Sequence, residues 1–178
     1  MPIRVVFFDL GDTLVEIAPD VVRDSARQIT ALTGYPISAT ELKQAEQAEW
    51  LVRPPRDFLW VKTEEQERKF WEDDFYPSVL RRLGIASCPP HLAQLLAARA
   101  MDPRSFVLFP EVKEVLGALR RAGVGLGIIS NSFPSAERIL QHLKLMRYFS
   151  RIIWSHRCGY AKPEKEIFDA AFRCVRGT

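Results

Sequence analysis

IRVVFFDLGDTL, residues 3–14, begins as an almost wholly apolar run and turns polar at Asp9. The β-branched and aromatic residues from Val5 to Phe8 are typical of a strand that is covered on both faces, as in a parallel sheet. Open sheets of this kind bind ligands at the carboxyl ends of their strands. The stretch therefore predicts an α/β fold, with Asp9 as a candidate functional residue.

The second half of the chain alternates helix and strand patterns. We expect strands over 124–129 and 151–154, each ending in or before polar residues. Helices are expected after Pro110, over 136–143, and from Pro163 to Val175, because apolar residues recur there at helical spacing. This alternation predicts a doubly wound, Rossmann-like parallel sheet.

Residues 14–105 separate the first strand from this alternating half. Loops in α/β units usually have about 2–6 residues, so these 92 residues predict an inserted domain. The patterns are helical: Asp20 is expected to cap one helix, and Ser38 with Glu41 forms a capping box for another. We predict a core of residues 1–13 and 106–178 and a helical cap of residues 14–105.

Composition limits the function classes. The 178 residues carry 25 Lys and Arg against 22 Asp and Glu, a net charge of +3 that gives no support for nucleic-acid binding. There is no signal-peptide pattern or membrane-length apolar run, and the three cysteines form no CxxC. We expect a cytoplasmic protein without a membrane partner. Residues outside 14–105 carry 13 basic and 8 acidic residues, which favours a small anionic substrate.

Three polar residues lie at or just beyond the ends of three expected strands: Asp9, Ser130 and Lys162. Because parallel strands end at one edge of the sheet, these side chains are expected to converge. A carboxylate can attack phosphorus or bind a divalent cation, while a hydroxyl and an ammonium group can bind phosphate oxygens. The constellation predicts phosphoryl chemistry.

These segments resemble the motifs of a known family. Residues 7–14 (FFDLGDTL), 128–132 (IISNS) and 155–163 (SHRCGYAKP) are similar to motifs I, II and III of the haloacid dehalogenase superfamily, subfamily I. That branch has a helical cap between motifs I and II, where residues 14–105 lie. The resemblance implies a hydrolase with a Rossmann-like core and a C1-type cap.

The resemblance also implies a role for individual residues. Asp9 would be the nucleophile that forms an aspartyl-phosphate and a ligand of Mg²⁺, with the backbone carbonyl of Gly11 as a second ligand. Lys162 would bind both phosphate and Asp9. Phosphate binding or loop support is implied for Thr13, Ser130 and Asn131. The expected activity is Mg²⁺-dependent hydrolysis of a small phosphorylated metabolite.

Two departures from the family pattern leave alternatives open. Phosphatases of this superfamily usually have an acid/base aspartate two positions after the nucleophile, where this chain has Gly11, with Asp12 displaced by one residue. We interpret Asp12 as a loop residue, and whether it compensates for Gly11 stays open. Because the dehalogenase branch lacks that aspartate, 2-haloacid dehalogenation is the alternative activity.

Motif IV, the acidic pair that completes the metal site in the family, has no counterpart in the sequence. Only 16 residues follow Lys162, and the last expected helix uses most of them. We therefore expect either a piece of a longer protein or a non-catalytic pseudoenzyme. Without a neighbouring strand, residues 5–8 would form an apolar sheet edge, through which the chain could self-associate.

Overall fold

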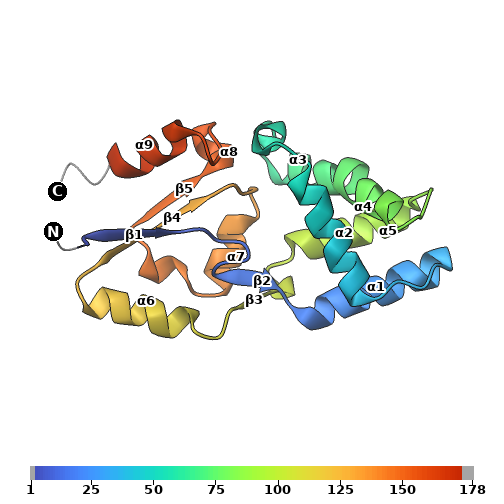
Figure 1. Ribbon diagram of the computed structural model, residues 1–178, viewed down its shortest axis with the longest axis horizontal. Helices are drawn as coiled ribbons and strands as arrows, with labels where there is room; N and C mark the ends of the chain where they lie inside the picture. Colours follow the sequence, from blue (N-terminus) through green and yellow to red (C-terminus); the bar gives the residue numbers. More distant parts are fainter. Residues whose placement is uncertain (1–2, 174–178) are drawn as a thin grey trace.

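The computed structural model describes residues 3–173 and contains a three-stranded parallel sheet beside a group of helices (Figure 1). Its strands are β1 (Val5–Phe8), β4 (Gly125–Ser130) and β5 (Arg151–Trp154), in the order β1-β4-β5. Both pairings are parallel, so all three strands end at the same edge. The predicted parallel α/β fold is confirmed.

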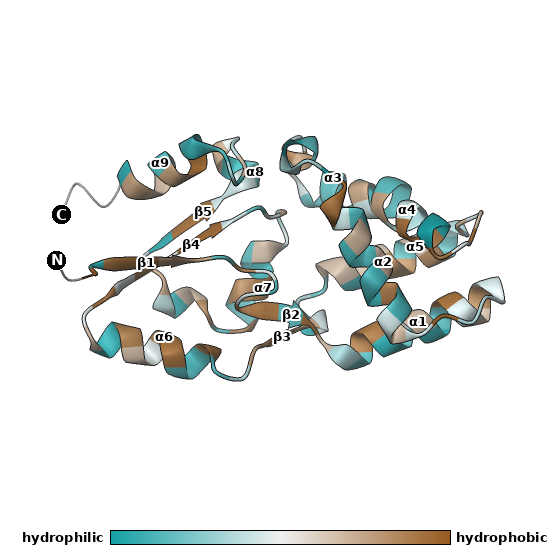
Figure 2. Ribbon diagram, viewed as in Figure 1, coloured by the Kyte–Doolittle hydropathy of each residue, from teal (hydrophilic) through white to brown (hydrophobic). Residues whose placement is uncertain are grey.

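Helices cover both faces of this sheet (Figure 1). Val6 and Phe8 pack in one apolar cluster with α6 (Val112–Arg121) and α7 (Ala136–His142). Phe7 points the other way and packs in a second cluster with α9 (Lys165–Arg173). The strands are accordingly hydrophobic along their length, whereas the helices show apolar and polar faces (Figure 2). Two-sided burial explains the continuous apolar run in β1.

The segment from residue 18 to residue 105 is mainly helical, as expected. Its α-helices are α1 (Pro19–Thr33), α2 (Ala39–Leu51), α3 (Glu64–Lys69), α4 (Tyr76–Arg82) and α5 (Pro90–Met101). A π-helix, η2 (Phe70–Phe75), joins α3 to α4. Single turns of 3₁₀-helix are η1 (Pro55–Phe58), η3 (Pro103–Ser105) and, in the sheet half, η4 (Met146–Tyr148). These helices enclose their own apolar core, separate from the clusters on the sheet.

A small ribbon connects the two parts. β2 (Val15–Ile17) pairs antiparallel with β3 (Phe106–Leu108), and in Figure 1 the ribbon lies between the sheet and the cap helices. The sequence analysis missed β2 and β3 because three residues are too few to show a period. The chain leaves the sheet half through β2 and returns to it through β3, so the ribbon holds these two connections side by side. They lie close to the boundaries predicted at residues 13/14 and 105/106. Those boundaries stay a prediction.

Several local predictions can be compared with the structure. The Ser38–Glu41 capping box is present at the start of α2. The prediction for Asp20 was wrong: α1 begins at Pro19, after Ala18, with no side-chain cap. Proline at the first helical position needs no amide partner, so the helix starts two residues earlier than a cap at Asp20 would place it.

The prediction that Pro163 opens the last helix was also wrong. The Lys162–Pro163 peptide is cis and lies in the turn before α9, which begins at Lys165. The expected end at Val175 lies outside the described residues. The four-residue helix α8 (Ser155–Cys158), directly after β5, was not predicted. None of the helices between residues 3 and 173 has the length and hydropathy of a membrane-spanning segment.

Gly127 on β4 tests how closely the sheet is packed. It lies opposite Phe7 on β1, and a Cβ atom at this position would be 2.4 Å from the Phe7 ring. We expect Gly127→Ala to lower the free energy of unfolding by about 1–3 kcal/mol, as overpacked cores do. Gly117→Ala in α6 is the matched control, because only the flexible end of Arg121 lies within 4 Å; it should be neutral or stabilising by about 0.5–1 kcal/mol. Urea unfolding measures both, and equal destabilisation would contradict the packing argument.

Candidate active site

The carboxyl ends of the three strands bring the predicted charged pair together. Asp9 follows β1, and Lys162 lies in the loop between α8 and α9. The Lys162 Nζ atom is 2.8 Å from Asp9 Oδ1, and the backbone N–H of Leu10 donates to the same oxygen at 2.7 Å. Among the described residues Oδ2 of Asp9 has no such partner. One carboxylate oxygen is thus held in place while the other stays available.

Asn131, directly after β4, fixes the position of Lys162 through its backbone. Its side-chain oxygen accepts a hydrogen bond from the Lys162 N–H at 2.7 Å, and its amide donates to the Lys162 carbonyl at 3.0 Å. This pair joins the loop after β4 to the loop after β5. Of the two roles expected for Asn131, phosphate binding or loop support, the observed contacts are those of loop support.

Serines line the same end of the sheet. Ser130 is buried at the last position of β4. The backbone N–H of Ser132 donates to the Ser155 hydroxyl at 3.0 Å, and the Ser132 carbonyl lies 3.0 Å from Nδ1 of His156. Burial lowers the pKa of His156. The Ser132 hydroxyl is buried and has no hydrogen-bond partner among the described residues.

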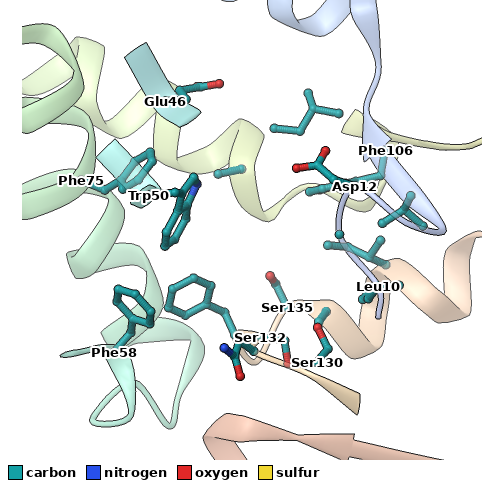
Figure 3. Close-up of a pocket in the computed structure, with 18 of the residues that line it drawn as sticks. Leu10, Asp12, Glu46, Trp50, Phe58, Phe75, Phe106, Ser130, Ser132 and Ser135 are labelled. Carbon is teal, nitrogen blue, oxygen red and sulfur yellow. The ribbon is translucent and has the colours of Figure 1, made fainter. Parts of the chain in front are cut away.

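The turn after β1 places Asp12 toward the cavity. Asp12 has a left-handed φ of 53°, and its N–H donates to the Val15 carbonyl at 2.9 Å, which closes the turn. Its carboxylate points into the cavity (Figure 3) and makes no hydrogen bond or ion pair with other residues of 3–173. A Cβ atom added at Gly11 would meet nothing within 4 Å. Thr13 is exposed and does not line the cavity.

A cavity of about 440 Å³ lies between the strand ends and the cap helices. Figure 3 shows its two walls: Leu10, Asp12, Ser130, Ser132 and Ser135 on one side, and Trp50, Phe58 and Phe75 on the other. This size is within the usual range for small-molecule sites. Asp9, Gly11, Ser130 and Asn131 line it, so these predicted site residues share one cavity.

The aromatic wall belongs to a larger cluster of rings. Trp50 lies 4.6 Å from Phe75 and 5.4 Å from Phe58, measured between ring centroids. Phe133, from the loop after β4, reaches into this cluster, with centroids 5.0 Å from Phe70 and 5.1 Å from Trp71. The motif II loop therefore contributes a side chain to the apolar core of the cap.

Further polar contacts join the cap to the sheet half. Glu67 of α3 is fully buried and accepts hydrogen bonds from the N–H and hydroxyl of Ser135, at 2.8 and 2.5 Å. Burial raises the pKa of Glu67, and the hydrogen bonds from Ser135 and Trp71 oppose that shift. Sequence reasoning missed Glu67, since nothing in a charged helical segment marks one glutamate as buried.

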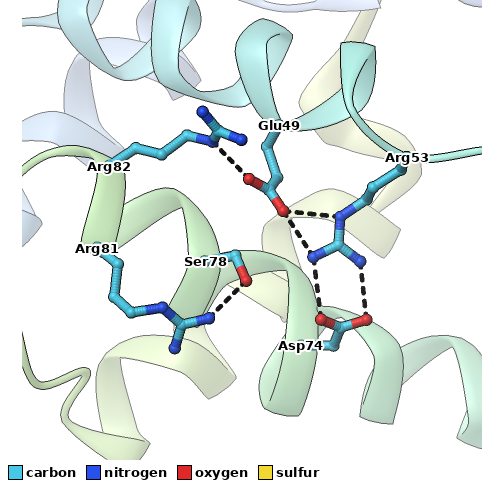
Figure 4. A network of polar contacts seen from close by, with 6 residues as sticks. All are labelled: Glu49, Arg53, Asp74, Ser78, Arg81 and Arg82. Atoms are coloured by element: carbon cyan, nitrogen blue, oxygen red, sulfur yellow. Dashed lines mark hydrogen bonds and ion pairs between the residues drawn. The ribbon is translucent and has the colours of Figure 1, made fainter.

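The basic residues beside the Pro54-Pro55 turn are engaged with protein groups. Arg56 pairs with Glu164 of the sheet half, and the Lys62 ammonium donates to the His156 carbonyl at 2.6 Å. Arg53 lies between two carboxylates, 2.7 Å from Glu49 and 2.8 Å from Asp74 (Figure 4). These cations stabilise the cap and its contact with the core.

The same network fixes the end of α2, where Trp50 lies. Glu49 accepts from both Arg53 and Arg82 (Figure 4). Although burial raises the pKa of Glu49, the hydrogen bonds from the two arginines outweigh it, so the pKa lies below its ordinary value. Arg53 also stacks over the rings of Phe70 and Phe75, at 5.6 and 5.7 Å from their centroids. The ion-pair network of Arg53 thus packs directly against the aromatic cluster.

The donors near Asp9 are suitable in kind for Mg²⁺. A carboxylate oxygen and the Gly11 carbonyl are hard oxygen ligands, and Mg²⁺ usually binds through one or two carboxylates together with substrate phosphate and water. Within residues 3–173 no group of three His, Cys, Asp or Glu side chains forms a metal cluster. The residues present therefore fit a site in which substrate and water complete the coordination.

The family is decided by a model of haloacid dehalogenase-like hydrolases that matches residues 3–177. The chain belongs to this family. The core and cap described above agree with its solved members: the L-2-haloacid dehalogenase RSc1362 superposes with a TM-score of 0.70 at 22% identity, covering 99% of this chain and 74% of that one. At this identity the likeness shows the fold alone.

Curated relatives include proteins named as phosphatases. The chain is 26% identical over 178 residues to a phosphoglycolate phosphatase of Salmonella typhimurium, covering 92% of this chain and 66% of the relative. It is 23% identical over 177 residues to the haloacid dehalogenase-like hydrolase domain-containing protein 3 of Danio rerio, covering 98% and 73%. These relatives support a hydrolase and leave the substrate open.

Glu46 of α2 is a titratable group in the cavity wall that the sequence analysis did not single out. Its carboxylate points into the cavity from the cap side (Figure 3). Burial raises the pKa of Glu46 to about 7, and Lys43 only partly opposes this. A carboxyl group that is half protonated near neutral pH thus lies opposite Asp12.

This shift makes folding stability depend on pH. In the unfolded chain Glu46 loses its proton near pH 4.5, and in the folded protein near 7. Between these values the folded state holds an extra proton, so the free energy of unfolding should fall as pH rises, by at most about 1.4 kcal/mol per pH unit. Glu46→Gln removes this dependence. Urea unfolding of both proteins from pH 4.5 to 7.5 tests it; parallel profiles would contradict the raised pKa.

Proposed function

We propose that this protein hydrolyses a phosphomonoester, with Asp9 as the nucleophile. The observation that carries the proposal is the Asp9–Lys162 pair at 2.8 Å, on the edge of a cavity that Ser130 and Asn131 also line. A carboxylate beside an ammonium group and strand-end hydroxyls suits attack on an anionic phosphate. The relatives named as phosphatases support the same chemistry.

The reaction would have two steps. The free Oδ2 of Asp9 attacks phosphorus, a P–O bond forms, and the ester P–O bond to the leaving alcohol breaks. Water then attacks the aspartyl-phosphate, which releases inorganic phosphate and restores Asp9. Lys162 holds Oδ1 and offsets negative charge on the phosphoryl oxygens, and the Ser130 and Ser132 hydroxyls donate to these oxygens.

Mg²⁺, bound by Asp9 and the Gly11 carbonyl together with the substrate phosphate, would reduce the repulsion between the carboxylate and the anionic substrate. The departing alkoxide needs a proton, and the second carboxyl group in this turn belongs to Asp12. Its carboxylate faces the cavity and is not engaged by other described residues. We therefore assign Asp12 the proton donor's role, and the turn-closing role to its backbone N–H.

The nucleophile is tested by Asp9→Asn. With benzyl phosphate and Mg²⁺, we expect the wild type to release inorganic phosphate and the variant to lose at least about 10³-fold in kcat, because an amide cannot form the phosphoenzyme. Asp73→Asn, an exposed carboxylate on η2, is the matched control and should keep wild-type turnover. Equal rates for wild type and Asp9→Asn would refute the assignment.

The acid is tested by Asp12→Asn. General acid catalysis typically contributes about 10²–10⁴-fold, so kcat should fall by that order while KM changes little. Since position 11 has room for a side chain, Gly11→Asp added to Asp12→Asn should restore part of the rate. Turnover of Asp12→Asn equal to the wild type would limit Asp12 to its place in the turn.

Dehalogenation of a 2-haloacid is the second candidate, and Gly11 is the observation that favours it. Attack of Asp9 on carbon expels halide directly, so a proton donor to the leaving group is unnecessary. The apolar walls of the cavity also suit a carbon–halogen centre. Chloride release from 2-chloropropionate without Mg²⁺, with no phosphate release from phosphomonoesters, would select this candidate.

A further inference from the structure

We propose that the substrate's leaving group is uncharged, apolar and about the size of a phenyl ring, and that the aromatic wall of the cavity binds it. This inference rests on the proposed phosphomonoester hydrolysis. It concerns the part of the cavity beyond the phosphate, where the cap side chains lie.

Rings from the cap and from the loop after β4 form a surface. Trp50, Phe58 and Phe133 are only partly buried and line the cavity, while Phe70 is buried behind them and does not. Figure 3 shows Trp50 and Phe58 across the cavity from Ser130 and Asp12. A substrate whose phosphate meets Asp9 therefore extends its other end toward these rings. Removing an apolar group of ring size from water typically tightens binding about 10- to 100-fold.

Among the described residues that line the cavity, no cation is left unpaired for a second anionic group. The cations among its described lining residues are Lys43 and Arg53. Lys43 lies 3.6 Å from Glu16, and Arg53 is held by Glu49 and Asp74. A distal carboxylate or second phosphate on the substrate would lose its hydration without gaining a partner.

Glu46 adds a reason to exclude such a group. Its carboxylate points into the cavity on the cap side and makes no hydrogen bond with other described residues. Above neutral pH its charge would repel a distal anion on the substrate. The rings, the paired cations and Glu46 thus favour the same substrate: a phosphate at one end and a neutral apolar group at the other.

The test is the binding of three phosphonates, in which a carbon–phosphorus bond replaces the ester linkage and cannot be hydrolysed. Isothermal titration of the full chain at pH 8 with Mg²⁺ compares benzylphosphonate, methylphosphonate and phosphonoacetate. We expect benzylphosphonate to bind at least 10-fold more tightly than the other two. Equal or tighter binding of methylphosphonate or phosphonoacetate overturns the inference, as does no detectable binding of benzylphosphonate.

Two variants locate the effect. Phe133→Leu removes a ring that lines the cavity, and Phe70→Leu removes a neighbouring ring that does not, with their centroids 5.0 Å apart. Phe133→Leu should weaken benzylphosphonate binding at least 5-fold and leave methylphosphonate unchanged, whereas Phe70→Leu should affect neither. Equal effects of the two variants on benzylphosphonate would overturn the role of the wall.

Turnover separates this inference from the proposed function. Benzyl phosphate and phosphoglycolate are both phosphate esters of primary alcohols. A difference between their kcat/KM values therefore reports how the cavity binds the group beyond the phosphate more than how easily the alcohol departs. Preference for benzyl phosphate supports both proposals, and preference for phosphoglycolate overturns the inference alone. Selective benzylphosphonate binding without turnover of either ester overturns the proposed function and leaves the apolar subsite supported.

Discussion

The parallel hydrogen bonding of β4 to both β1 and β5 is the constraint on which the site depends. It brings the ends of three strands, far apart along the chain, to one edge of the sheet. Asp9 and Ser130 are placed by that register directly. Lys162 lies beyond the sheet, and its two backbone hydrogen bonds with the Asn131 side chain place it so that the ammonium group reaches Asp9.

The cap is joined to this edge by contacts of different kinds. Phe133 enters the apolar core of the cap, and Ser135 donates to the buried carboxylate of Glu67. Both residues lie within five positions of Ser130. A movement of the cap would therefore move the loop that directly follows Ser130, because a buried carboxylate separated from its donors costs several kcal/mol. The position of the cap and the carboxyl edge of the sheet are mechanically coupled in this fold.

The sequence supported some predictions better than others for physical reasons. The strands, the parallel sheet and the helical insert follow from periodicity and local chemistry, and the capping box at Ser38 depends only on residues three positions apart. The predictions for Asp20 and Pro163 were wrong for different reasons. Pro19 starts the first helix before Asp20, and Pro163 lies in the turn before the last helix rather than in the helix itself. The three-residue strands β2 and β3 depend on pairing across the whole insert, which leaves no local pattern.

The sequence alone placed Asp9 and Ser130 at the ends of two strands and Lys162 beyond a third, and it placed them together because the carboxyl ends of parallel strands share an edge. The motifs around them also indicated the family. Only the tertiary structure decided what faces them across the cavity. Trp50 and Phe133 are more than 80 residues apart, and Glu46 is one of several acidic residues on a helix. Whether such side chains meet a ligand depends on which helix face packs inward, and that is settled by contacts between distant segments.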